Sequence, residues 1–157
     1  MNHKYIDTKT FDIVNNVFEV DEKIAESISL LNKKGYYTRY SCSGHVKDPR
    51  MYEMYRVKKS EKFDDKDLGY VVKDNEDDYE ILMPNRYTSI YVMFDKKYEF
   101  DNLPIGFYTL DDEVTTIYKD IMYYENKIKK KSNDIESEIK KFNIKLLEWV
   151  KSLPIIK

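Results

Sequence analysis

The densest group of chemically active side chains is Arg-Tyr-Ser-Cys-Ser-Gly-His at residues 39–45. Exposed amides in such a turn can form a nest for an anion such as phosphate or carboxylate, and Gly44 lets a ligand approach the backbone closely. Ser41 and Ser43 add hydroxyl groups, basic residues supply charge, and Tyr40 stacks on the ligand. The residues expected to bind this ligand are Arg39, Tyr40, Ser41, Cys42, Ser43, Gly44, His45 and Arg56.

The surrounding stretch, residues 33–59, mixes basic and aromatic side chains. Basic groups hold phosphates and aromatic rings stack on bases, so the mixture favours a nucleotide or single-stranded RNA. It is also typical of a basic surface whose alternate tyrosines are half-buried strand residues, and both interpretations stay open. The members of the mixture are Lys33, Lys34, Arg39, Lys47, Arg50, Arg56, Lys58 and Lys59, with Tyr36, Tyr37, Tyr40, Tyr52 and Tyr55.

Cys42, three residues before His45, also fits nucleophilic catalysis, because a hydrogen-bonded imidazole can generate a thiolate. A cysteine at the end of a strand is more often a small buried hydrophobic residue, so no catalytic residue is assigned. One Cys and two His provide no ligand spacing typical of structural zinc, and the acidic runs at 64–67 and 74–78 are typical of solvated surface. We therefore expect no required metal.

A helix and a strand are expected to position this loop. Asp21 can cap the first turn of a helix, in which three apolar residues follow at the i, i+4, i+7 spacing of a buried face. Gly35 can end this helix in a left-handed cap. The helix is thus expected at 21–34, and the β-forming residues after Gly35 predict a strand at 36–42 that ends in the tight loop 43–45.

The middle of the chain alternates short extended stretches with polar ones. Residues 46–59 are compatible with either a strand or a short helix, and residues 61–78 predict an acidic surface insertion or loop. Strands are expected at 79–83 and 87–94, paired antiparallel across the turn-like Pro84-Asn85-Arg86. Short edge strands are expected at 98–100 and 107–110.

The C-terminal segment 112–153 predicts a pair of helices. Apolar residues from Val114 to Ile128 recur at alternating spacings of three and four, which is typical of a helix face. Asn133 and Glu136 form a candidate capping box for the second helix. The apolar stripe of the pair is expected to pack in the core or to join two copies in a homodimer. The fold class is therefore α+β, with a mainly antiparallel sheet, one early helix and two C-terminal helices.

The composition is that of a globular protein with one domain, residues 1–157. The chain is 41% hydrophobic and 15% aromatic, which is too rich in core-forming residues for a disordered chain. Its single Cys excludes a disulfide framework within the chain and suits a reducing cytoplasm. No window approaches the roughly 20 apolar residues of a membrane span, and the first residues lack the apolar stretch of a signal peptide. We expect a cytoplasmic protein without a membrane partner.

Residues 20–45 resemble the N-terminal signature of the wybutosine-synthesis tRNA methyltransferase family. The likeness is carried by Val20-Asp21-Glu22-Lys23-Ile24, Leu31-Asn32 and Tyr36-Tyr37-Thr38-Arg39-Tyr40-Ser41-Cys42-Ser43-Gly44-His45, in which His45 stands where the family has Arg. The resemblance implies a mixed α/β fold, a site at Ser41 to Gly44, tRNA as substrate and S-adenosylmethionine as methyl donor. In length the chain is more similar to short bacterial proteins of unassigned function.

Two functions follow from these observations. The first is a nucleotide- or RNA-binding protein related to this family, with an anion site in the loop from Ser41 to His45. The second follows from the segregation of charge, because residues 61–80 carry three basic and nine acidic side chains. A segment of this kind can mimic nucleic acid or engage a basic protein. The alternative function is therefore a non-enzymatic interaction or ligand-sequestering protein, such as a mobile element encodes, that acts through the acidic segment or the helical hairpin.

Overall fold

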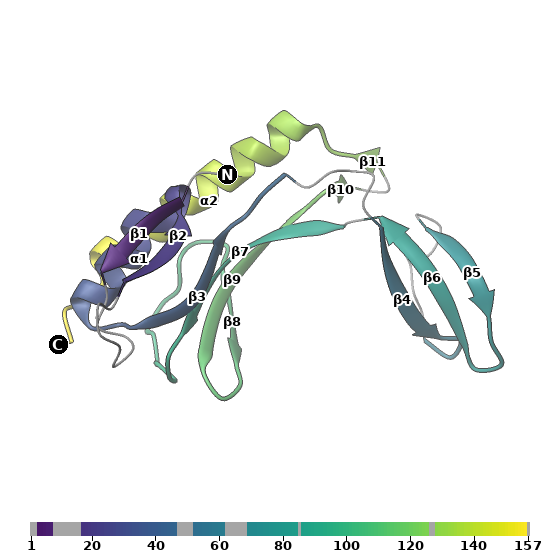
Figure 1. The fold of residues 1–157 in the computed structure, drawn as a ribbon, viewed down its shortest axis with the longest axis horizontal. Coiled ribbons are helices and arrows are strands. Elements are labelled where there is room, and N and C mark those ends of the chain that lie inside the picture. Colours follow the sequence, from purple (N-terminus) through teal and green to yellow (C-terminus); the bar gives the residue numbers. More distant parts are fainter. Residues whose placement is uncertain are drawn as a thin grey trace.

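The computed structural model describes residues 3–7, 17–46, 52–61, 69–84, 86–125 and 128–156 (Figure 1). In chain order its elements are β1 His3–Asp7, β2 Val17–Asp21, α1 Glu22–Lys34, β3 Thr38–Ser43, β4 Tyr52–Lys58, β5 Tyr70–Asp74, β6 Asp78–Pro84, β7 Tyr87–Phe94, β8 Tyr108–Asp111, β9 Thr115–Met122, β10 Tyr124–Glu125, β11 Ile128–Lys129 and α2 Ser132–Ser152. The strand pairs among these elements are antiparallel. A mixed helix and antiparallel-sheet fold is therefore confirmed.

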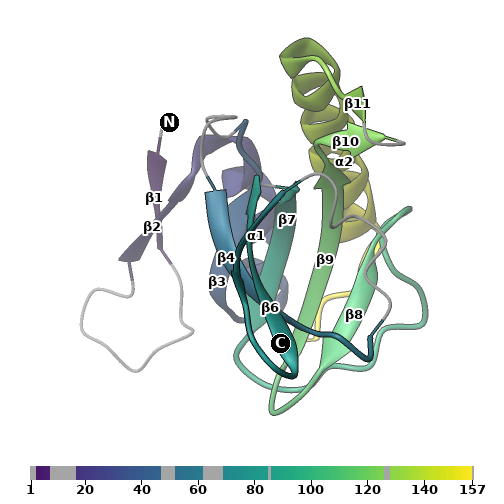
Figure 2. The same cartoon turned by 90° about the vertical axis from the view of Figure 1, so that its right-hand side faces the viewer.

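The main body is a four-stranded sheet in the order β3-β7-β9-β8, and α1 and α2 lie together on one face of it (Figure 1). Figure 2 shows these strands side by side, with α2 behind them. Ile90, Val92 and Phe94 alternate along β7 on the face toward the helices, and each is fully buried. Together with Ile117 and Ile121 of β9 they form the sheet side of the hydrophobic core. Within the described residues, no helix lies on the opposite face of the sheet.

The early helix forms where the sequence predicts it. Its stripe at Ile24, Ile28 and Leu31 is buried, and Gly35 ends the helix with a left-handed φ of 100°. Asn32 then ties the helix to the following strand, because its Nδ2 donates to Thr38 Oγ1 at 3.0 Å and its Oδ1 accepts from Thr38 N at 3.3 Å. These contacts set the direction in which β3 leaves the helix.

A second, three-stranded sheet in the order β4-β6-β5 projects away from the helix-covered body (Figure 1). Its strands are joined by ion pairs as well as by the backbone ladder. Arg56 of β4 contacts Asp78 at 3.6 Å and Glu80 at 3.4 Å, and Lys59 contacts Asp74. Several of the acidic side chains expected to form an interaction surface are therefore paired with bases of the same sheet.

The prediction of the first of two C-terminal helices is wrong. The segment after Asp112 forms β9, β10 and β11, and the inner face of β9 alternates Ile117, Lys119 and Ile121 with the period of a strand. Lys119 Nζ lies 4.7 Å from the centre of the Phe142 ring of α2, so a lysine occupies an apolar position of the alternation. Because Lys119 is polar, the nearest apolar residues on this face, Ile117 and Ile121, are four positions apart in the sequence. This spacing is the one that a helix face has. The predicted helical hairpin does not form.

The second predicted C-terminal helix is confirmed as α2, with different end chemistry. Its N-cap is Lys131 and makes no side-chain cap, so the predicted capping box is wrong. Ile135, Ile139 and Leu146 are buried against the chain's own core, which uses the face that was considered for a homodimer. Neither helix in the described ranges is long and apolar enough to cross a membrane.

The middle of the chain pairs differently from the prediction. The expected pairing of 79–83 with 87–94 is wrong, because β6 pairs with β4 and β5, whereas β7 pairs with β3 and β9. Part of the expected surface loop at 61–78 is the strand β5, all of whose residues are exposed. Residues 62–68 of this loop and 47–51 of the undecided segment lie outside the described residues. The undecided segment forms β4, and the edge strand near 107–110 is confirmed as β8. Residues 98–100 form no strand.

Candidate functional site

The loop after β3 directs its backbone donors at acceptors of the same chain. Ser43 N donates to Asp21 Oδ2 at 3.1 Å, Gly44 N donates to Cys42 Sγ at 3.4 Å, and His45 N donates to Thr88 Oγ1 at 3.0 Å. These are the amides expected to form an anion nest. A bound anion would have to displace the Asp21 carboxylate and would be repelled by it. The geometry therefore favours a cation or a neutral ligand at this loop.

Asp21 is the residue that changes the chemistry of the loop. It occupies the N-cap position of α1, as its sequence context predicts, but its side chain caps no amide of that helix. Its Oδ2 instead accepts hydrogen bonds from Ser43 N and from Ser43 Oγ, the latter at 3.0 Å. The end of β2 therefore brings a carboxylate to the end of β3.

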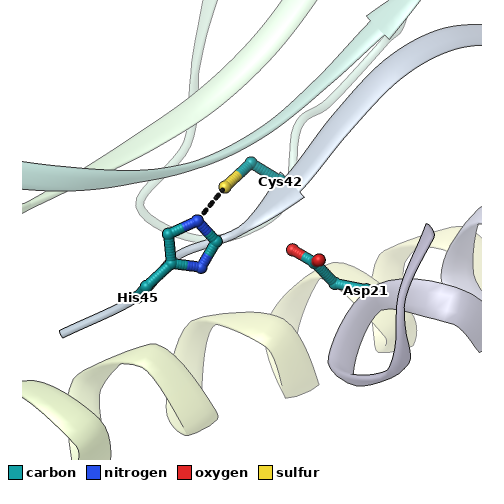
Figure 3. A group of neighbouring side chains, drawn as sticks. All are labelled: Asp21, Cys42 and His45. Carbon is teal, nitrogen blue, oxygen red and sulfur yellow. Dashed lines mark hydrogen bonds between the residues drawn. The ribbon is translucent and has the colours of Figure 1, made fainter. Parts of the chain in front are cut away.

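Cys42 and His45 lie against each other beside this carboxylate (Figure 3). Cys42 Sγ is 3.5 Å from His45 Nε2, and the Asp21 side chain points toward the pair. One ligand atom from each of the three residues lies within 4.8 Å of the other two. Cys42 and His45 are partly buried, so a small ligand can still reach them. The thiol and the imidazole, which the sequence separates by three residues, are therefore in contact in the structure.

The backbone of His45 is held at both polar groups. Its N–H donates to Thr88 Oγ1, and its carbonyl oxygen accepts a hydrogen bond from Tyr123 Oη at 2.8 Å. On the other side of the loop, Asn143 Nδ2 of α2 donates to Ser43 O at 2.9 Å. The loop is thus fastened to the sheet and to the C-terminal helix, which preorganises its side chains.

Gly44 serves the packing of the loop rather than the approach of a ligand. Its φ of 81° lies in the left-handed region, which side chains rarely adopt. An added Cβ would meet Ile90 Cγ1 at 3.3 Å and Ile139 Cγ1 at 3.5 Å, both in the core. The space beside the Gly44 α-carbon, which the sequence analysis assigned to a ligand, is therefore occupied by core side chains of the protein.

The remaining residues that the sequence predicts for the site lie on different faces and in different sheets. Tyr40 pairs with Met93 and faces outward, whereas Ser41 pairs with the buried Val92 and lies on the helix side of the sheet. Arg39 is exposed at a register shift of β3. Arg56 belongs to the three-stranded sheet, where its side chain is paired with Asp78 and Glu80. The loop therefore gains Asp21, and Arg56 is engaged elsewhere.

A row of aromatic side chains crosses the open face of the four-stranded sheet and ends at Cys42. Cys42 pairs with Tyr91, Tyr91 pairs with Tyr118, and Tyr118 pairs with Tyr108. Directly paired residues of antiparallel strands present their side chains on the same face. The Tyr108 and Tyr118 rings are 6.1 Å apart between centroids. Tyr40 and Tyr87 lie on the same face in neighbouring rows, with exposed fractions of 65% and 45%.

Tyr91 is the member of this row that borders the Cys42 centre. Burial raises the pKa of Tyr91, and the neighbouring Cys42 and Asp21 groups raise it further. Its hydroxyl group therefore stays protonated and neutral at physiological pH. On the other side of the centre lies a cavity of about 430 Å³, whose lining includes Asp21, Ser43, Gly44 and His45.

Reasoning from the sequence missed Asp21 and the row of Tyr91, Tyr108 and Tyr118 as site residues, although it included Tyr40. Asp21 precedes an amphipathic helix, where a capping role is the local expectation. Tyr118 was placed on a helix that does not form, and Tyr91 and Tyr108 were treated as ordinary strand residues. The alternation of Tyr87, Ser89, Tyr91 and Met93 against buried residues was the available signal for the outer face.

The chain was compared with known proteins in three ways. A scan of protein-family models, a search of curated proteins and a search of solved structures each found no match for the chain.

Proposed function

We propose that this protein binds a nucleotide or single-stranded RNA by stacking bases on the open face of its four-stranded sheet. The observation that carries this proposal is the row Tyr108, Tyr118 and Tyr91, which crosses the sheet and ends beside Cys42. Antiparallel sheets with helices on one face use exposed aromatic side chains on the other face to stack bases of single-stranded RNA. The row here has that placement.

The charge on this face favours stacking over contacts with phosphate. Among the outward-facing positions of β7 and β9 the one charged residue is Asp120, which accepts a hydrogen bond from Ser89 Oγ. Among the described residues, Arg39 is an exposed cation of the edge strand β3, and we assign it to phosphate contact. Base stacking on aromatic rings contributes roughly 1 to 3 kcal/mol per base and tolerates any sequence. Affinity should therefore depend only weakly on salt.

The resemblance of residues 20–45 to the tRNA methyltransferase signature supports the same class of ligand. A relation to that family, and S-adenosylmethionine as a cofactor, are part of the proposal. In the structure Asn32 of this signature holds β3 against α1, and Gly44 packs on the core. The serines and glycine of the signature thus position Cys42 and His45, and the bases would be bound by the tyrosines beside them.

The alternative interaction function has less support. Its helical hairpin is replaced by β9 and α2, and the acidic side chains at 74, 78 and 80 are paired with Arg56, Lys59 and Lys73. Acidic side chains that are paired with bases of their own sheet are less available to mimic nucleic acid or to engage a basic protein.

The test is a fluorescence anisotropy titration of the full chain with labelled short single-stranded RNA, together with unlabelled mononucleotides and S-adenosylmethionine as competitors. Tyr118→Ala should weaken RNA binding about tenfold or more, because it removes the central ring of the row. Tyr118→Phe keeps the ring and should bind like the unmodified protein.

Tyr70→Ala is the matched control, since Tyr70 is an exposed strand tyrosine on the other sheet. It should leave RNA affinity unchanged. Equal affinity in Tyr118→Ala and the unmodified protein would overturn the proposal. An equal loss in Tyr70→Ala would move the binding surface away from the row.

A further inference from the structure

We propose that Asp21, Cys42 and His45 form a binding site for a divalent transition-metal ion, with Zn²⁺ as the best match. The three side chains come from the end of β2 and from the end of β3 with its loop, and Figure 3 shows them converging on one point. This site goes beyond base stacking, because neither Asp21 nor His45 belongs to the tyrosine row. It assigns to the centre a role that ligand spacing along the chain did not reveal.

The donor set selects the kind of metal. Thiolate and imidazole ligands favour zinc and other transition metals, whereas calcium and magnesium take oxygen ligands. Zinc is bound by Cys sulfur, His nitrogen and Asp oxygen, all of which are present here. A tetrahedral ion with bonds of about 2.3 Å to sulfur and about 2.0 Å to nitrogen separates those two atoms by about 3.5 Å. Cys42 Sγ and His45 Nε2 are 3.5 Å apart.

The side chains are supported in the way that metal ligands usually are. Asp21 Oδ2 accepts two hydrogen bonds from Ser43, and the Gly44 amide donates to Cys42 Sγ. His45 is anchored through its backbone to Thr88. Such outer contacts orient the ligands and stabilise a thiolate, so a metal would require only a closing movement of the Asp21 carboxylate toward the pair.

Three protein ligands leave one tetrahedral position for water or a substrate atom. The cavity of about 430 Å³ beside the centre is lined by Asp21 and His45 and gives access to that position. Glu22 and Glu136 also line it, against one base, Lys23, so the cavity favours a cation. A structural zinc site takes four protein ligands, whereas three ligands with an accessible fourth position are typical of zinc sites that act on a bound molecule.

The first experiment is a titration of chelator-treated full-length protein with Co²⁺ and Zn²⁺. Cobalt in a tetrahedral site with one thiolate should give a sulfur-to-metal charge-transfer band, and Cys42 is the single cysteine of the chain. Calorimetry should show one Zn²⁺ per chain. Cys42→Ser and His45→Gln should weaken Zn²⁺ binding more than about 100-fold, and Ser43→Ala, which removes one contact to Asp21, about tenfold.

The controls are His3→Gln, the other histidine, and Asp120→Asn, a carboxylate of the tyrosine face. Both should bind Zn²⁺ like the unmodified protein. In the unmodified chain Zn²⁺ should also slow alkylation of Cys42. This measurement does not depend on the folding of any variant. Absence of the charge-transfer band and of this protection would overturn the site, as would Zn²⁺ binding that survives Cys42→Ser and His45→Gln. RNA affinity of Tyr118→Ala is measured separately, so failure of one proposal is distinguishable from failure of the other.

Discussion

The four-stranded sheet and the three-stranded sheet share an antiparallel ladder but obtain their stability from different sources. The first buries one face beneath α1 and α2, with Ile90, Val92 and Phe94 fully buried. The second, β4-β6-β5, buries Ile81 and Met83 of β6, carries ion pairs around the exposed Arg56 and leaves β5 exposed along its length. A buried aliphatic or aromatic side chain contributes roughly 1.5 to 3 kcal/mol, whereas an exposed ion pair contributes at most about 1 kcal/mol.

This difference explains where a functional surface can lie. Because the helix-covered face of the four-stranded sheet supplies the burial, its other face is free to carry Tyr91, Tyr108 and Tyr118 without endangering the fold. The three-stranded sheet has fewer buried side chains to stabilise it. The following changes test the contrast, from the largest expected effect to the smallest.

Phe94→Ala should cost about 4 kcal/mol of unfolding free energy, because it removes a fully buried ring that packs against Tyr98 and Phe100. Met54→Ala, at an exposed position of β4, should change the unfolding free energy by less than about 0.5 kcal/mol. Urea denaturation followed by circular dichroism measures both. Equal losses in the two variants would show that both sheets depend on burial to the same degree.

Asn32→Ala should cost about 2 kcal/mol, since it leaves the buried Thr38 amide without its side-chain acceptor. The matched variant in the other sheet is Asn75→Ala, whose Nδ2 contacts Asp78 and Glu80 in a partly exposed turn. This change should cost less than about 1 kcal/mol. Thermal and urea unfolding of the two variants measure the difference, and a larger loss in Asn75→Ala would contradict it.

Stability should fall above pH 10 because of Tyr98 in the main body. Burial is the main cause that raises the pKa of Tyr98 to about 12; the hydrogen bond from the Tyr37 amide lowers this pKa, and the nearby Asp95 carboxylate raises it. The neutral phenol is thus favoured in the folded state, so its contribution is fully present below pH 10 and is lost as pH rises from 10 to 12. After allowance for solvent screening, the loss should be about 1 kcal/mol.

Tyr98→Phe should flatten this part of the stability profile, measured as urea midpoints against pH. Tyr70→Phe, which changes an exposed tyrosine of the three-stranded sheet, should leave the slope as it is. An unchanged slope in Tyr98→Phe would assign the alkaline loss to other groups.

Arg56→Ala should have the smallest effect, a loss of about 0.5 kcal/mol or less. Its partners Asp78 and Glu80 form exposed ion pairs with it, and such pairs are weakened by solvent and salt. The loss should disappear in urea titrations at about 1 M salt. A loss that is large and independent of salt would mean that Arg56 has a structural role like that of the buried core.

Local signals predicted the elements that have local causes. The spacing of Ile24, Ile28 and Leu31 and the cap at Gly35 are properties of a short segment, and α1 forms as expected. The predicted helix after Asp112 is wrong because Lys119 takes an inward strand position, where its ammonium group lies over the Phe142 ring of α2. Strand partners also depend on distant segments, so β6 and β7 were wrongly joined as a hairpin.

The sequence by itself determined the early helix, the helix at the C-terminus and the residue types in the loop that holds Cys42 and His45. Only the tertiary structure decided that Asp21 turns from its own helix to Ser43, because that contact requires the ends of β2 and β3 to lie together. It also aligned Tyr91, Tyr118 and Tyr108, since a row across strands exists only once each register is set. The type of each side chain is given by the sequence at that position. Which side chains come into contact depends on how segments that are distant in the sequence bury their apolar surfaces together.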